Sequence, residues 1–183
     1  SAASDVYKRQ GYDKDLHAHS PDLAIQLRPS SPITPGAVWP SGLTFEALLA
    51  DMIDPAWPLV ALVYDDEVSG QSNPFEALVA SGLVALLHDR LGPPLHEERD
   101  TEDKSWDRTY TVSELLKLGV GVVAPHRAQG SLTVTHLGAL LRPVGGTYAE
   151  VRGAVDTVER FQGGQRDVII ASFGLGDPDL IAS

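Results

Sequence analysis

The hydrophobic pattern of the chain predicts four strands. Continuous apolar runs of strand length occur at 59–64 (LVALVY), 120–125 (VGVVAP) and 168–173 (VIIASF), and a shorter β-branched run occurs at 155–158 (VDTV). Runs without alternating polar residues are typical of strands that are buried on both faces. A polar, glycine-bearing segment, FQGGQRD at 161–167, separates the last two of these runs.

Between the apolar runs, hydrophobic residues recur every three or four positions, which predicts helices. These segments are 43–53 (LTFEALLADMI), 72–91 (SNPFEALVASGLVALLHDRL), 111–119 (TVSELLKLG) and 126–142 (HRAQGSLTVTHLGALLR). Ser72 or Asn73 can cap the second helix, Pro74 suits its first position, and Gly119 can serve as the C-cap of the third. Strands that alternate with helices predict an α/β fold, with a mainly parallel sheet covered by helices on both faces.

Three other regions are not expected to join the sheet. Residues 1–10 (SAASDVYKRQ) lack a start methionine and resemble a translated sequencing or cloning scar, and we expect the gene to be truncated at both ends. Residues 11–58 form a proline-rich, poorly patterned segment, in which His17 and His19 are interpreted as a solvated pair. The charged segment 92–108 is interpreted as a surface excursion.

Composition narrows the class of protein. The 183 residues suffice for one domain with a core, and 43% hydrophobic with 21% charged residues is ordinary for a globular chain. No apolar run reaches the ~18 residues of a membrane span, so no membrane partner is expected. The absence of cysteine excludes disulfides and thiolate metal sites and suits a cytoplasmic location. The net charge of −11 argues that any nucleic acid is bound by a local patch.

Parallel sheets bind ligands at the carboxyl ends of their strands, which directs attention to 64–72, 125–129 and 160–167. The glycines of GVGVVA at 119–124 precede a strand, so this segment does not fit a dinucleotide fingerprint. Neither a phosphate-binding loop nor a G-x-S-x-G elbow is present in the sequence. Asp65 and Asp66 could hold Mg²⁺, but a solvated strand end is the favoured interpretation.

Three blocks, SNPFEALVA (72–80), VGVVAPHRAQGSL (120–132) and VDTVERFQGGQRDVIIASF (155–173), occur in the order found in one helicase family. Together they resemble the second RecA-like domain of superfamily 1 helicases, in the branch of the nonsense-mediated-decay helicase. The corresponding family patterns are S-x-N-x-x-E-A, IGVITPYRAQ and TVDRFQGQEKDVIIVS. The resemblance implies a RecA-like fold (the second motor domain of a P-loop NTPase), of which residues 59–183 would be a partial C-terminal helicase domain.

In that family the F-Q-G loop lies in the cleft between two RecA-like domains, so the resemblance assigns Gln162, Gly163 and Gln165 to nucleotide binding. Gly163 lets the backbone approach a phosphate or ribose, and the two glutamines supply uncharged donors and acceptors. Asp167 is expected to order the loop or start the next strand. Gln165 stands where the family usually has glutamate, so a charged contact with the nucleotide would be lost.

The resemblance also assigns three residues to nucleic-acid binding. Thr157 can offer its hydroxyl to a phosphate, and Arg127 and Gln129 can do the same after Pro125. His126 stands where the family has tyrosine, so the resemblance assigns no stacking role to this position.

The function predicted on this basis is a fragment of an ATP-dependent superfamily 1 helicase. Its partners would be single-stranded DNA or RNA and the first RecA-like domain of the parent chain, and the cofactors of the parent would be ATP and Mg²⁺. The phosphate-binding loop and the acidic magnesium motif belong to that first domain, so the isolated chain is expected to be inactive. The alternative is a non-catalytic α/β binding or interaction module without motor activity.

Overall fold

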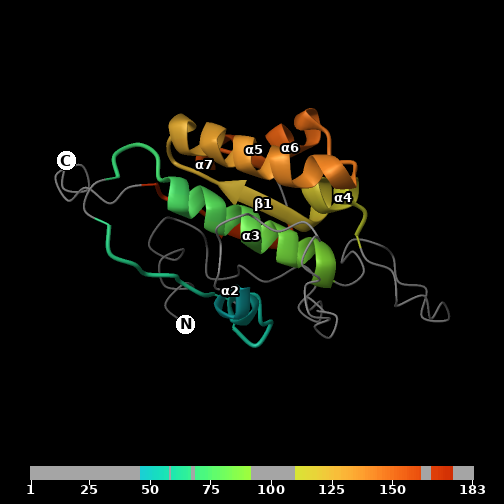
Figure 1. Ribbon diagram of the computed structural model, residues 1–183, viewed down its shortest axis with the longest axis horizontal. Helices are drawn as coiled ribbons and strands as arrows, with labels where there is room; N and C mark the ends of the chain where they lie inside the picture. Colours follow the sequence, from blue (N-terminus) through green and yellow to red (C-terminus); the bar gives the residue numbers. More distant parts are fainter. Residues whose placement is uncertain (1–45, 58, 67–68, 92–109, 162–165, 175–183) are drawn as a thin grey trace, which may run out of the picture.

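The computed structural model describes residues 46–57, 59–66, 69–91, 110–161 and 166–174 (Figure 1). In chain order its elements are α2 (Glu46–Met52), α3 (Pro74–Arg90), α4 (Val112–Glu114), the π-helical turn η1 (Leu115–Gly119), β1 (Val120–Val123), α5 (Arg127–Leu141), the 3-10 turn η2 (Arg142–Val144), α6 (Tyr148–Ala154), β2 (Val155–Asp156), α7 (Val158–Phe161) and β3 (Val168–Ala171). Each of the four predicted helices has a helical counterpart in this order.

The three strands form one parallel sheet in the order β2–β1–β3. Val122 of the central strand pairs with Val155, and Val120 pairs with Val168. Parallel neighbours need a crossover connection, and α5 with α6 supplies the one between β1 and β2. The predicted α/β class and the parallel sheet are therefore confirmed. The carboxyl edge of this sheet is the edge at which Val123, Asp156 and Ala171 end their strands.

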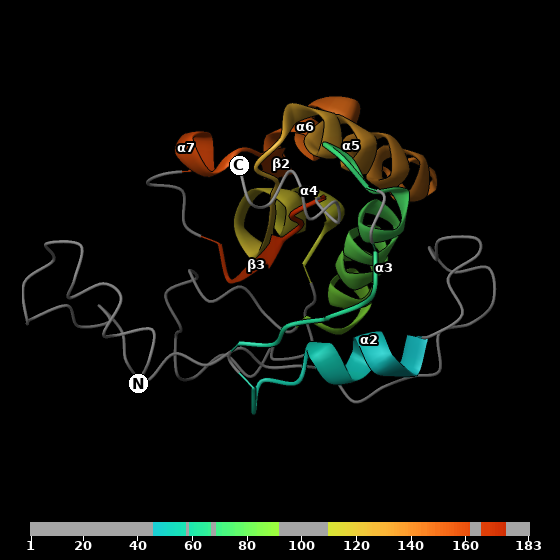
Figure 2. The same cartoon turned by 90° about the vertical axis from the view of Figure 1, so that its left-hand side faces the viewer.

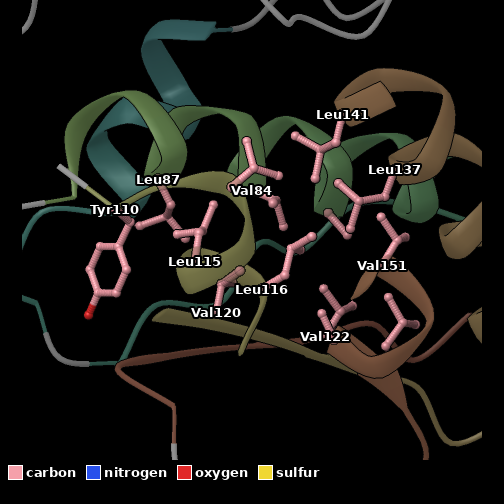
Figure 3. Packing of buried hydrophobic residues seen from close by; sticks show 14 of the residues in the cluster. Val84, Leu87, Tyr110, Leu115, Leu116, Val120, Val122, Leu137, Leu141 and Val151 are labelled. Carbon is pink, nitrogen blue, oxygen red and sulfur yellow. The ribbon is translucent and has the colours of Figure 1, made fainter. Parts of the chain in front are cut away.

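The core lies between the sheet and the helices α3, α5 and α6, which Figure 2 shows together on one side of the strands. Val120 and Val122 of β1 are fully buried and point into this core. They pack in one cluster with Val84 of α3, Leu137 of α5 and Val151 of α6 (Figure 3). Burying each such side chain contributes about 1.5–3 kcal/mol, so this layer holds the helices on the sheet.

The second face of the sheet is covered differently. Gly121 points away from the core, and Phe161 at the end of α7 lies against it: a Cβ at Gly121 would be 2.3 Å from Cζ of Phe161. Ile169 of β3 is 49% exposed. Of the helices that the structure describes, α3, α5 and α6 cover the first face, and the one-turn helix α7 reaches the second face through Phe161, so the predicted helical cover is extensive on the first face only.

The helix α3 is the centre of the fold. The sequence predicts it as amphipathic, yet its small residues Ala80, Ser81, Gly82 and Ala85 are as buried as its leucines. One side of α3 contacts α5 and the sheet, and α2 packs on another side through a second cluster around Leu86. The α3 helix therefore has neighbours on several sides, which removes the polar face that an amphipathic surface helix would need.

The prediction of a first strand at 59–64 is wrong. Residues 59–66 form neither a strand nor a helix, with a bend at Leu59, and Leu59 and Val63 are 85% and 87% exposed. Only Leu62 packs against the cluster between α2 and α3. Hydrophobicity alone predicted this strand, but strand formation also requires the backbone to align with an edge strand, which a short apolar run does not encode.

Smaller differences concern the ends of elements. The run VDTV is a strand only at Val155 and Asp156, because Val158 already begins α7. The strand β3 ends at Ala171, two residues earlier than predicted. Gly119 is not a left-handed C-cap; among the described glycines, positive φ angles occur at Gly145 and Gly174. The side chain of Leu115 lies 3.0 Å from the place where a Cβ of Gly119 would be, so close packing is what suits glycine there.

Several predictions fall outside the described residues. These are the scar at 1–10, the pair His17 and His19 with most of the proline-rich segment, the excursion at 92–108, and the F-Q-G residues Gln162, Gly163 and Gln165. No helix in the described ranges has the length and apolar character needed to cross a membrane.

Candidate functional site

The three segments that carry the family resemblance meet at the carboxyl edge of the sheet, and Gln129 in the first turn of α5 connects them. Its side-chain oxygen accepts a hydrogen bond from the backbone N–H of Asn73 at 2.6 Å. Its side-chain nitrogen donates to the carbonyl of Asn73 at 3.2 Å and to the hydroxyl of Ser172 at 2.8 Å. Gln129 is fully buried. One amide thus joins the start of α3, the start of α5 and the end of β3.

Glu76, in the first turn of α3, makes a second connection between the start of α3 and the end of β3. Its Oε2 accepts hydrogen bonds from the Ser172 hydroxyl and from the N–H of Gly174, both at 2.8 Å. Its Oε1 accepts a bond from the hydroxyl of Tyr64 at 2.6 Å. Hydrogen bonds to a charged acceptor are stronger than neutral ones, so Glu76 fixes the segment after β3 against α3.

Asn73 uses both its backbone and its side chain. As the N-cap of α3, it accepts a bond from the N–H of Glu76 at 3.1 Å through Oδ1. Its Nδ2 donates to the Tyr64 hydroxyl at 2.9 Å and to Oδ2 of Asp66 at 2.5 Å. The other oxygen of Asp66 accepts from the N–H of Ser69 at 3.1 Å. These bonds hold the segment before α3 against the helix.

The seven connected residues are called the edge cluster below: Tyr64, Asp66, Asn73, Glu76, Gln129, Ser172 and Gly174. Burial raises the pKa of the Tyr64 phenol above its ordinary value, and the hydrogen bond and charge of Glu76 act in the same direction. Tyr64 therefore stays protonated at neutral pH and serves as a donor to Glu76. Gly174 has a φ of +69° and would place a Cβ 3.0 Å from Cγ of Gln129, so both its backbone and its packing favour glycine.

Two of the three residues assigned to nucleic acid are placed at this edge. Arg127 is exposed at the first position of α5. Thr157 lies between β2 and α7, where its N–H donates to Oδ1 of Asp156 at 2.8 Å. The N–H of Ala124 donates to the Asp156 carbonyl at 3.0 Å, so the ends of β1 and β2 are joined close to Thr157.

Gln129 is placed differently from what the sequence predicts. It was assigned to nucleic acid beside Arg127, but its side chain is fully buried and both ends of its amide are bonded within the protein. On an α-helix, residues two positions apart point in different directions, so Arg127 faces solvent while Gln129 faces the edge cluster. In this structure Gln129 is not accessible to a nucleic-acid strand.

The residues on either side of the undescribed segment 162–165 are anchored. Asp167 accepts a hydrogen bond from the hydroxyl of Tyr110, and its N–H donates to the carbonyl of Leu118 at 3.2 Å. The guanidinium carbon of Arg166 lies 5.3 Å from the centre of the Phe161 ring. Asp167 directly precedes β3, and its two bonds attach the start of this strand to Tyr110 and Leu118, whereas the loop that it was expected to order lies outside the described residues.

Sequence reasoning missed the wider roles of Asn73 and Glu76: Asn73 was interpreted only as a possible helix cap, and Glu76 was not assigned to a site. A signal was available: both belong to the S-x-N-x-x-E-A pattern, and capping alone does not require this particular pair. The hydrogen bonds from Ser172 and Gly174 to Glu76 connect residues almost one hundred positions apart, and no local sequence pattern predicts them.

No group of three or more His, Cys, Asp and Glu side chains suited to a metal ion occurs among the residues that the structure describes. Asp66 is bonded to Asn73 and Ser69 and Asp65 is exposed, but the two carboxylates do not stand at a strand end, because 59–64 is not a strand. The fold and the edge cluster define the chain as an α/β protein with a polar site at the carboxyl edge of a parallel sheet. Comparison with models of protein families, with curated proteins and with solved structures finds no match.

Proposed function

We propose that this chain contributes part of the second, RecA-like motor domain of a superfamily 1 helicase. One observation carries the proposal: the three sequence blocks that resemble the family are joined side chain to side chain. Glu76 belongs to the first block, Gln129 to the second and Ser172 to the third, and all three lie in one hydrogen-bonded cluster. Unrelated short matches have no reason to converge at the edge where parallel sheets bind ligands.

The proposed contact with single-stranded DNA or RNA is narrower than the sequence predicts. Arg127 and Thr157 remain as contacts to phosphate, and Gln129 becomes a residue that positions Arg127 by fixing the first turn of α5. Contacts of this kind set the position of a strand without reading its sequence. With a net charge of −11 and few cations available to release counterions, the chain should bind weakly.

ATP and Mg²⁺ belong to the proposal through the parent protein. The residues assigned to the nucleotide, Gln162, Gly163 and Gln165, lie outside the described part of the chain. The described residues offer no group of three that fits a metal ion, so no step of phosphoryl transfer is assigned to them. In the proposal, the lysine and the magnesium ligands come from the first RecA-like domain of the parent.

The proposal is tested by titrating fluorescein-labelled oligo(dT) and oligo(U) with the purified chain at several salt concentrations and recording fluorescence anisotropy. Arg127→Ala should weaken binding to both strands about equally and reduce the salt slope by about 0.7, the value for one phosphate on a single strand. Arg142→Ala is the matched control, since it removes the same charge from an exposed residue just after the other end of α5, about 22 Å away. Equal effects of the two substitutions would show that binding is unspecific and would contradict the proposal.

The second candidate is an α/β interaction module without motor activity. Ile169 on the second face of the sheet and Val158 at the start of α7 are 49% and 59% exposed, so both side chains would be available to a protein partner under this alternative. Under this alternative the chain would bind neither oligonucleotide even at low ionic strength. The anisotropy titration therefore separates the two candidates.

A further inference from the structure

One carboxylate at the carboxyl edge of the sheet holds two donors of the kinds that bind phosphate. Asp156, the last residue of β2, accepts a hydrogen bond from the backbone N–H of Thr157 through Oδ1, at 2.8 Å. Its Oδ2 lies 3.7 Å from Nε of Arg160, in α7. Backbone N–H groups and guanidinium groups are the donors that proteins use for the phosphates of nucleic acids. The Asp156 carboxylate therefore has the partners that a phosphate would have.

The ion pair between Asp156 and Arg160 is exposed enough to exchange. The side chain of Arg160 is 69% exposed, and that of Asp156 is 22% exposed. Exposed pairs four positions apart contribute little to stability, because water screens the charges and both side chains lose freedom. The N–O distance of 3.7 Å is also longer than that of a hydrogen bond. The guanidinium can therefore leave the carboxylate for a stronger anionic partner at little cost.

The backbone around the pair is fixed at both ends. The carbonyl of Asp156 accepts a hydrogen bond from the N–H of Ala124 at 3.0 Å, which ties the end of β2 to the end of β1. The carbonyl of Thr157 accepts from the N–H of Phe161, also at 3.0 Å, and this bond closes the turn of α7 that carries Arg160. A change of partner therefore needs a movement of the Arg160 side chain and none of the backbone.

Arg127, proposed above as a contact to phosphate, lies close to this segment. It begins α5 three residues after Ala124, whose N–H is bonded to Asp156. The first turn of α5 also lies against β2, because a Cβ on Gly130 would be 3.9 Å from Cγ1 of Val155. A strand whose phosphates contact Arg127 would therefore pass close to the Asp156 carboxylate.

We propose that Asp156 is an internal competitor of the strand: its carboxylate occupies Arg160 in the free chain, and a phosphate of a single-stranded nucleic acid displaces it. This inference rests on the proposed function and goes beyond it, since it adds Arg160 to the contacts and makes Asp156 a group that restrains binding. In the exchange Arg160 turns from carboxylate to phosphate, while Thr157 keeps its bond to Asp156 and offers its hydroxyl. Such a competitor weakens binding to all strands alike, because phosphates carry no sequence information.

The test titrates fluorescein-labelled oligo(dT) and oligo(U) at low ionic strength, with anisotropy as the readout. Asp156→Asn removes the charge and keeps an oxygen that accepts from the Thr157 N–H. It should bind both strands about fourfold more tightly, with about twofold from the release of Arg160 and about twofold from the lost repulsion of phosphate. Arg160→Ala should bind more weakly than wild type, and Arg160→Lys should retain most of the affinity because it keeps the charge.

Asp89→Asn is the matched control for a general gain of positive charge. Asp89 is exposed in the last turn of α3, about 20 Å along the helix from Glu76 at the carboxyl edge. At that distance salt screens its charge from a strand at the edge, so both affinities should stay close to those of wild type.

A double substitution separates competition from simple repulsion. In the Arg160→Ala background, Asp156→Asn should tighten binding about twofold instead of about fourfold, because no cation is left to release. Equal factors with and without Arg160 would show that Asp156 only repels the strand, and would overturn the inference.

Two other results would also overturn it: a gain from Asp156→Asn no larger than that from Asp89→Asn, or wild-type affinity in Arg160→Ala. In either case, weaker binding by Arg127→Ala would still support the proposed function. Absence of binding by both the wild-type chain and Asp156→Asn would overturn both proposals.

Discussion

Replacing Gln129 by leucine tests whether the edge cluster holds the carboxyl edge together. Leucine has nearly the same volume, so the substitution removes hydrogen bonds without opening a large cavity. The backbone N–H of Asn73 would lose its acceptor inside the protein, whereas the Asn73 carbonyl would keep its bond from the N–H of Ala77 at 3.1 Å. Ser172 would keep Glu76 as its acceptor and lose the bond from Gln129.

The magnitude follows from this inventory of bonds. One buried donor without a partner costs about 1–3 kcal/mol, and the lost bond to Ser172 adds about 1 kcal/mol. We therefore expect the free energy of unfolding to fall by about 2–4 kcal/mol, a large part of the ~5–15 kcal/mol typical of a domain. Urea unfolding of the chain, followed by circular dichroism, measures the change.

Two further variants separate the hydrogen bonds from other effects. Gln71→Leu is the same chemical change at an exposed position and should alter stability by less than about 0.5 kcal/mol. Gln129→Glu places a second carboxylate beside Glu76. One oxygen of this carboxylate would face the Asn73 carbonyl oxygen, which is also an acceptor. Burial and repulsion should therefore raise the pKa of the new carboxyl group above its unfolded value. Its destabilisation should then be greatest at neutral pH and decrease as the pH falls. If Gln129→Leu is as mild as Gln71→Leu, the reasoning about the edge cluster is wrong.

The remaining predictions concern the second face of the sheet and the helix α6. Gly121→Ala should cost about 1–3 kcal/mol in urea unfolding, because its Cβ would lie 2.3 Å from Cζ of Phe161; adding Phe161→Leu should recover part of the loss, and strictly additive losses would contradict this account. The hydrogen bond from the Ser113 hydroxyl, with those from Thr147 and the charge of Lys117, lowers the pKa of Glu150 to about 2. Because the pKa of Glu150 is lower in the folded than in the unfolded chain, ionised Glu150 stabilises the fold above about pH 4.5, and this stabilisation is lost as the pH falls toward about 2. The thermal midpoint of Glu150→Gln should therefore decrease less than that of the wild type over this pH range. Equal decreases in the two proteins would exclude Glu150 as a source of acid sensitivity.

Local chemistry in the sequence predicted local structure well. The pair Asn73 and Pro74 marks the start of α3, because an N-cap side chain and a residue without an N–H satisfy the first turn of a helix wherever it lies. The strand β1 and most of β3 were predicted because they are apolar runs that also pair, although only β1 is buried and β3 alternates between half-buried and exposed residues. The run at 59–64 has the same composition and does not pair, since pairing depends on the position of a distant edge strand.

The sequence predicted where in the fold the candidate site lies, but not which of its side chains face outward. The segments that contain Arg127 and Thr157 do lie at the carboxyl edge, because parallel strands end there in any α/β fold. Which side chain of the R-A-Q segment faces outward depends on the helical phase of α5 relative to α3. That phase is set by packing between residues more than fifty positions apart, such as Asn73 and Gln129, and the sequence does not display it.

The residues of the family-like blocks thus fall into two groups that should respond differently to substitution. Gln129 and Glu76 point inward and connect α3, α5 and β3, so their loss should reduce stability. Arg127 is exposed on the first turn of α5, which these bonds align with α3, so its loss should reduce binding and leave unfolding nearly unchanged. A strand that contacts Arg127 needs the first turn of α5 in a fixed position, which the bonds between Gln129 and Asn73 maintain. Preorganisation of this kind explains how an acidic chain with few available cations could bind a single strand at one edge: the polar residues inside the cluster hold the few outward groups in place.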